Sequence, residues 1–135
     1  MSEPRITIQL ANTDGSLRPG DLLSGRYQVH LENPEQLRAV EMSILWYTVG
    51  QSDEDFGIHY FERHARDDQT LNVVGQPRPI DTRLPNSPLS YQGVIVNLRW
   101  CVRVRLFLTR GREVVEESTF QLGTIPRAEV AHDLP

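Results

Sequence analysis

Lysine is absent from this sequence, and all 14 basic residues among its 135 are arginine. With 18 acidic residues, the formal net charge is −4 at pH 7, whereas nucleic-acid-binding domains usually carry a basic excess. We therefore expect no nucleic-acid partner. The arginines retain a property that lysines lack, because a guanidinium forms planar bidentate pairs with carboxylates.

Cysteine and long apolar runs are also scarce. Cys101 is the single cysteine, so no disulfide can form within the chain. No stretch approaches the ~20 apolar residues of a membrane-spanning helix. The first residues, MSEPRITIQL, place a proline and charges where a signal peptide needs an apolar run. We expect a protein of the reducing cytoplasm, without a membrane span.

Helical periodicity is nearly absent, and apolar residues instead alternate with polar ones, as in half-buried strands. Turn-forming clusters separate the alternating segments, including Pro19-Gly20-Asp21 and the polar, acidic loop 50–57. The pattern predicts strands at Arg5–Leu10, Arg26–Glu32, Arg38–Val49, Ile58–His64, Gln69–Val74 and Val94–Leu108, with an edge strand at Ile80–Leu84.

The clearest predicted strand is Val94–Leu108, in which eight alternate residues are apolar without interruption. Thr109-Arg110-Gly111 then predicts a three-residue hairpin loop, with Gly111 at positive φ. The resulting register sets Trp100 opposite Phe120 and Arg103 opposite Glu117. It also turns Glu116 inward, which predicts a β-bulge near Glu116-Glu117.

Seven or eight short strands without a helix predict a sandwich or a barrel. Two inner faces that carry Trp46 and Trp100 favour the all-β sandwich of two mainly antiparallel sheets. Trp46 and Trp100 are expected to be buried on facing or adjacent strands of its core. A chain of 135 residues suffices for one such core. We expect a single domain at residues 1–125 and a peripheral tail at 126–135.

Three stretches resemble the arrestin-like family. The first is RPGDLLSGRYQVHLENPEQLRAVEMSILWYTVG, residues 18–50, with a Pro-Gly-Asp turn, a glycine and then two strands. The second is LPNSPLSYQGVIVNLRWCVRVRLFL, residues 84–108, with prolines, Ser-Tyr and Gly before a long strand. The third is FQLG at Phe120–Gly123.

The resemblance implies an immunoglobulin-like β-sandwich that works as a non-enzymatic protein-binding adaptor or scaffold. Bacterial members of this group include sporulation-control-like proteins. Full arrestins have two such lobes, and this chain has room for one. Animal arrestins recognise phosphorylated receptors through lysines, and this chain has none.

A metal-like cluster is the main alternative. Asp53, Glu54 and Asp55 precede His59 and His64, and carboxylates near histidines can hold Mn, Fe or Zn. Strict alternation would place the two histidines on opposite faces of a strand, which favours a solvated acidic loop and no bound metal. A metal- or small-ligand-binding sandwich centred on residues 53–64 remains the second hypothesis.

Motifs for catalysis or cofactor binding are missing. The sequence has no Gly-x-Ser-x-Gly nucleophile elbow, no phosphate-binding loop and no dinucleotide fingerprint. We therefore expect neither an enzyme nor a cofactor. Cys101 alternates outward between Arg99 and Arg103, where positive neighbours would favour a reactive thiolate. A surface cysteine packed beside Thr119 is the favoured alternative.

The outward face of the long strand is the candidate partner-binding surface. Arg99, Arg103 and Arg105 line it, and they either pair with Glu117 and Glu41 or form the rim of an interface. The apolar residues that alternation also sends outward are Leu45, Val49, Ile95 and Phe107. If they cluster, they would suit a protein partner or a two-fold homodimer.

Overall fold

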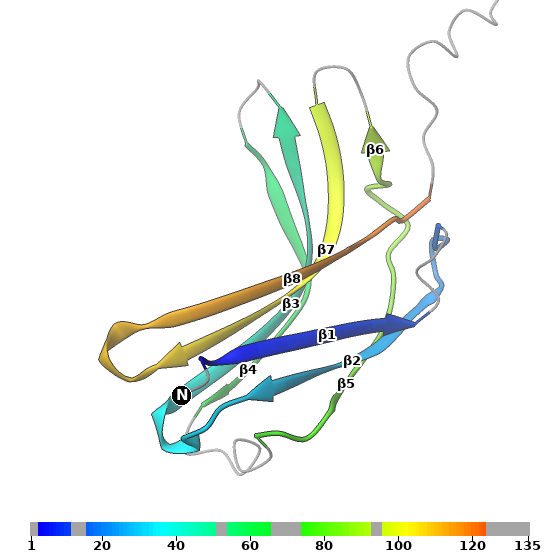
Figure 1. Cartoon of the computed structure of the whole chain (residues 1–135). Coiled ribbons are helices and arrows are strands. Elements are labelled where there is room, and N and C mark those ends of the chain that lie inside the picture. The colour runs from blue at the N-terminus through cyan, green and yellow to red at the C-terminus, as the bar shows by residue number, and fades with distance from the viewer. Residues whose placement is uncertain (1–2, 12–15, 51–53, 66–73, 93–95, 124–135) are drawn as a thin grey trace, which may run out of the picture.

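The computed structural model describes residues 3–11, 16–50, 54–65, 74–92 and 96–123. In this described part of the chain, eight strands form two layers (Figure 1), because the alternating pattern gives the strands apolar faces to bury. The strands are β1 (Arg5–Ala11), β2 (Leu22–His30), β3 (Leu37–Gly50), β4 (Phe56–Ala65), β5 (Arg78–Arg83), β6 (Tyr91–Gln92), β7 (Val96–Leu108) and β8 (Glu113–Phe120).

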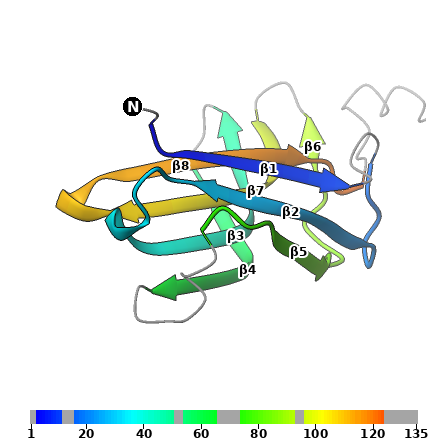
Figure 2. The ribbon, with the colours of Figure 1, turned by 60° about the horizontal axis from the view of Figure 1, so that its bottom comes forward.

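The two sheets are antiparallel. One has the order β1-β2-β5, and the other has the order β4-β3-β7-β6, with β8 also paired to β7. Figure 2 shows the three-stranded sheet lying across one face of the five-stranded sheet. This arrangement confirms the predicted all-β sandwich.

The core lies between the sheets. On the five-stranded sheet it is built from the alternate residues of β3 and β7 that face inward, and Trp100 at its centre is only 1% exposed. Trp100 Nε1 donates a hydrogen bond to the backbone oxygen of Pro88 over 2.8 Å. Trp46 pairs with Trp100 across β3 and β7. The adjacent strands were predicted correctly, but Trp46 is half-buried rather than buried.

The predicted turns have their expected geometry. In the Pro19-Gly20-Asp21 turn, Asp21 accepts a hydrogen bond from the backbone N–H of Arg18 through Oδ2, at 2.8 Å. In the loop after β7, a 3₁₀ turn η3 (Thr109–Gly111), Gly111 has a φ of 72°. The predicted pairing of Arg103 with Glu117 across this hairpin is confirmed.

Some boundaries differ from the sequence prediction. β2 begins at Leu22, four residues before Arg26, and β4 begins at Phe56, inside the segment predicted as a loop. The β7–β8 register runs without the bulge predicted near Glu116, whose side chain is exposed on the outermost strand. β5 lies at a sheet edge, as predicted.

Several predictions fall outside the described residues, namely most of the strand at Gln69–Val74, Ile95, and the tail at 126–135. Among the residues that the structure does describe, no helix has the length and apolar character needed to cross a membrane.

Candidate interaction surface

The outer face of the five-stranded sheet is the face turned away from β1, β2 and β5. Because side chains alternate along each strand, the register gives the residues that lie side by side on it. Across β4, β3 and β7 the rows are Phe56–Tyr47–Arg99, Ile58–Leu45–Cys101, Phe61–Ser43–Arg103 and Arg63–Glu41–Arg105.

Large apolar side chains are exposed at one end of this face. We call Val49, Phe56, Ile58 and Phe61 the outer apolar patch. Their exposed fractions are 40% for Val49, 65% for Phe56, 55% for Ile58 and 48% for Phe61. Four apolar side chains on two paired strands form a continuous surface, unlike the single exposed apolar residues of most protein surfaces.

A β-bulge in β4 brings the patch together. Ile44 pairs with Tyr60, but the next residue of β3, Leu45, pairs with Ile58, so His59 is an extra residue. The extra residue shifts the alternation by one, and Phe56 and Ile58 therefore lie on the same face as Phe61. Sequence alternation alone missed all three residues, because it gives residues 58 and 61 opposite faces.

The floor of the patch is buried. Leu45 points outward as predicted, yet it is 2% exposed, and Cys101 beside it is fully buried. Leu45 is therefore not an exposed contact residue, and Cys101 is not a surface cysteine.

The environment of Cys101 does not favour a thiolate. The pKa of its thiol is raised to about 12, mainly by burial and then by the hydrogen bond to the Glu117 carboxylate and its negative charge, whereas Arg103 lowers it by less. The thiol donates a hydrogen bond to Oε2 of Glu117 over 3.3 Å. The hypothesis of a reactive cysteine activated by neighbouring arginines is therefore wrong.

Ion pairs occupy the opposite end of the outer face. Arg103 pairs with Glu117 at 3.2 Å, as predicted, and Arg105 lies 3.7 Å from Glu113. Glu41 pairs with Arg63 instead of Arg105. Exposed pairs such as these contribute about 0–1 kcal/mol each, so their main effect is to neutralise this end.

Phe107 lies within this charged end. The guanidinium carbons of Arg63 and Arg105 lie 5.1 Å and 5.6 Å from its ring centroid, so two cations cover the ring. Of the six residues predicted to bind a partner, Arg99 alone is both exposed and without an ion pair among the described residues. Ile95 lies outside them.

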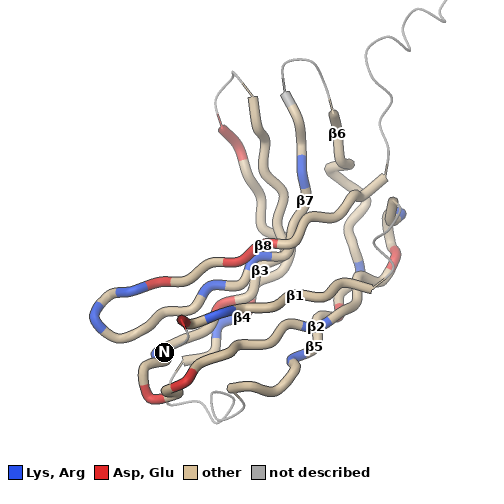
Figure 3. Tube along the Cα trace, viewed as in Figure 1, with Lys and Arg blue, Asp and Glu red and all other residues tan. Residues whose placement is uncertain are grey.

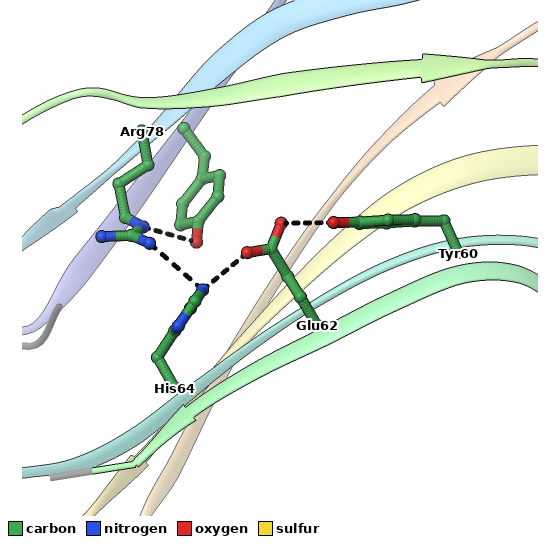
Figure 4. Close-up of polar contacts among 5 residues, drawn as sticks. Tyr60, Glu62, His64 and Arg78 are labelled. Atoms are coloured by element: carbon green, nitrogen blue, oxygen red, sulfur yellow. Dashed lines mark hydrogen bonds and ion pairs between the residues drawn. The ribbon is translucent and has the colours of Figure 1, made fainter. Parts of the chain in front are cut away.

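A polar cluster bridges the two sheets at the open edge between β4 and β5 (Figure 4). Nε2 of His64 lies 2.6 Å from Oε2 of Glu62 and 3.1 Å from Nη2 of Arg78. Nε of Arg78 donates to the hydroxyl of Tyr27 over 3.1 Å. Burial raises the pKa of that hydroxyl, so it stays neutral. On the Glu62 side, Tyr60 donates to Oε1 over 3.4 Å.

The two histidines of the metal hypothesis have separate partners. Nε2 of His59 donates to the backbone oxygen of Arg83 over 2.8 Å, and the ring meets Trp100 edge-on at 6.2 Å. The bulge therefore places His59 on the inner side with His64, and their predicted opposite orientation is wrong. Within the described residues, no three His, Cys, Asp or Glu side chains gather as metal ligands. Asp53 lies outside them.

Known proteins resemble this chain in fold and not in sequence. No family model and no curated protein matches it. Its structure is similar to that of Spo0M, a sporulation control protein from Bacillus subtilis, with a TM-score of 0.63 over 93% of this chain. The sequences are 13% identical, and this chain spans about half, 51%, of the Spo0M chain. The likeness shows an arrestin-like fold, which is the fold that the resemblance implied.

Proposed function

We propose that this arrestin-like sandwich is a non-enzymatic protein-interaction module of the cytoplasm and that it binds through the outer apolar patch. The observation that carries the proposal is the exposure of Phe56, Ile58 and Phe61 on one sheet face. Burying one such side chain contributes about 1.5–3 kcal/mol. Three of them are enough to anchor a partner, because a few central residues dominate most protein interfaces.

The edge of the sheet is a less suitable binding element than its face. β4 is an edge strand, and exposed edges can accept a strand from another chain. However, β4 contains the bulge at His59 and turns the charged Glu62 inward, and both features oppose strand addition. A partner that contacts side chains of the patch avoids both obstacles.

Affinity capture with variants of the patch tests the proposal. The wild-type chain, Ile58→Asp and Val115→Ser would each be used as bait in extract from the source cells. Val115 is the matched control, because it is 46% exposed on β8, where it pairs with Arg105 in the charged end of the outer face and away from the patch. We expect a protein that the wild type and Val115→Ser retain and that Ile58→Asp loses.

Circular dichroism and thermal melting would establish that Ile58→Asp is folded, and Phe61→Ser provides a second patch variant. Identical captures by all baits, or no captured protein at all, would contradict the proposal.

A further inference from the structure

Two opposite charges lie on opposite sides of the outer apolar patch. Glu54 lies two residues before Phe56, and the hydrogen bond from Thr48 N to Asp55 O, at 2.9 Å, extends the β3–β4 pairing to that point. Alternation then places Glu54 on the outer side. Arg99 lies on β7, next to Tyr47. Figure 3 shows an acidic segment just before β4 and a basic segment on β7 at the same end of the sheet, with β3 between them.

Glu54 and Arg99 are both exposed, and neither has an ion-pair partner among the described residues. The other outward-facing arginines of the described strands β4 and β7 are all paired, as shown above for Arg63, Arg103 and Arg105. The patch is thus an apolar surface with one free carboxylate on its β4 side and one free guanidinium on its β7 side.

This arrangement is complementary to itself. A two-fold axis that runs along β3, in the plane of the outer face, exchanges the β4 side of one copy with the β7 side of the other. Apolar side chains then meet apolar side chains, and each carboxylate meets a guanidinium. Glu54 and Arg99 lie in adjacent rows, about 7 Å apart along the strands, which an extended arginine side chain spans.

We propose that the outer apolar patch is covered by the same patch of a second copy, with Glu54 of each copy paired to Arg99 of the other. This inference rests on the proposed function and names the partner. A foreign segment would need both an acid and a base at the matching separation, whereas a second copy supplies them by symmetry.

Analytical ultracentrifugation of the purified chain between about 1 and 100 µM tests the inference. We expect a monomer–dimer equilibrium for the wild type and for the control Val115→Ser. Ile58→Asp and Phe61→Ser should be monomeric throughout the range. Arg99→Glu and Glu54→Arg, made singly, should each weaken dimerisation at least tenfold, because each places two like charges in contact.

The reversed double variant, Glu54→Arg with Arg99→Glu, should recover dimerisation to within about threefold of the wild type. An equimolar mixture of the two single variants should also dimerise more tightly than either alone, because both contacts of the mixed dimer then join a carboxylate to a guanidinium. A double variant as weak as the single variants would overturn the proposed arrangement.

Ultracentrifugation and affinity capture test the two proposals separately. A wild-type chain that is monomeric at 100 µM, or a dimer that survives Ile58→Asp, overturns the second copy as partner. If a foreign protein is still captured through Ile58 in that case, the proposed function stands. If nothing is captured either, both proposals fail.

Discussion

At the scale of single residues, the sheet face that a side chain occupies and its exposure to solvent are different properties. Leu45 and Cys101 both point outward, as alternation predicts, yet both are buried. The sequence shows which face a strand residue occupies, but the side chains that cover it come from neighbouring strands. Those neighbours depend on the pairing of β3 with β4, which the sequence pattern left undetermined.

Cys101 should resist chemical modification in the folded protein. Because its pKa is raised from 9.0 to about 12, the thiolate fraction at pH 8 is lowered about a thousandfold. We expect Ellman's reagent to label the native chain at least a hundredfold more slowly than the urea-unfolded chain. The rate should increase as the pH is raised toward 12. Full labelling of the native chain within minutes at pH 8 would show that the thiol is accessible.

Trp100 should be the most sensitive position of the core. Replacing it by alanine removes a fully buried ring and the hydrogen bond to Pro88, so we expect the free energy of unfolding to fall by about 3–5 kcal/mol. Trp100→Phe keeps most of the ring volume and should cost less. Urea unfolding followed by circular dichroism measures both values, and a loss below 1 kcal/mol for the alanine variant would contradict the assigned core.

At the scale of elements, strands and tight turns were predictable, and the bulge in β4 was not. The uninterrupted alternation of β7 and the glycine of η3 are local signals, so both the strand and the hairpin register follow from the sequence. The bulge at His59 depends on how β4 pairs with β3. No local signal marks it, and so the outer apolar patch was not predictable either.

The hairpin loop allows a test in which packing plays no part. Gly111 has a φ of 72° with no atom near the position of an added Cβ, and Arg110 has a φ of 65°. Left-handed backbone costs a non-glycine residue roughly 1–2 kcal/mol. We therefore expect Gly111→Ala to lower the free energy of unfolding by about 1 kcal/mol and Arg110→Gly to raise it slightly. Urea unfolding would decide, and the opposite signs would contradict the assigned loop conformation.

At the scale of the whole molecule, the sandwich was predictable because seven or eight alternating segments must bury their apolar faces, and the two inner faces that carry Trp46 and Trp100 favoured two packed sheets over a barrel. The resemblance to arrestin-like proteins agrees with the similarity to Spo0M in fold. The contact between the two sheets was less predictable. Arg78 on β5 bonds to Tyr27, its partner on β2 of the same sheet, and His64 on β4 contacts Arg78 from the other sheet.

This polar cluster should stabilise the open edge of the sandwich between β4 and β5. Tyr27 is almost fully buried, and its hydroxyl accepts a hydrogen bond from Arg78. Arg78→Met leaves the buried hydroxyl without that partner, so we expect a loss of about 1–3 kcal/mol in the free energy of unfolding. Tyr27→Phe should cost less, because the half-buried guanidinium still reaches other acceptors.

A double-mutant cycle isolates this interaction from the other contacts of each residue. If the hydrogen bond links β2 to β5 as the structure shows, the loss in Tyr27→Phe with Arg78→Met should be smaller than the sum of the two single losses by about 0.5–1.5 kcal/mol. Urea unfolding at pH 7 supplies all four free energies. The pair Thr7 and Arg78 serves as a control, because Thr7 on β1 bonds to His30 and not to Arg78. Strictly additive losses for Tyr27 and Arg78 would mean that this hydrogen bond between β2 and β5 does not contribute to stability.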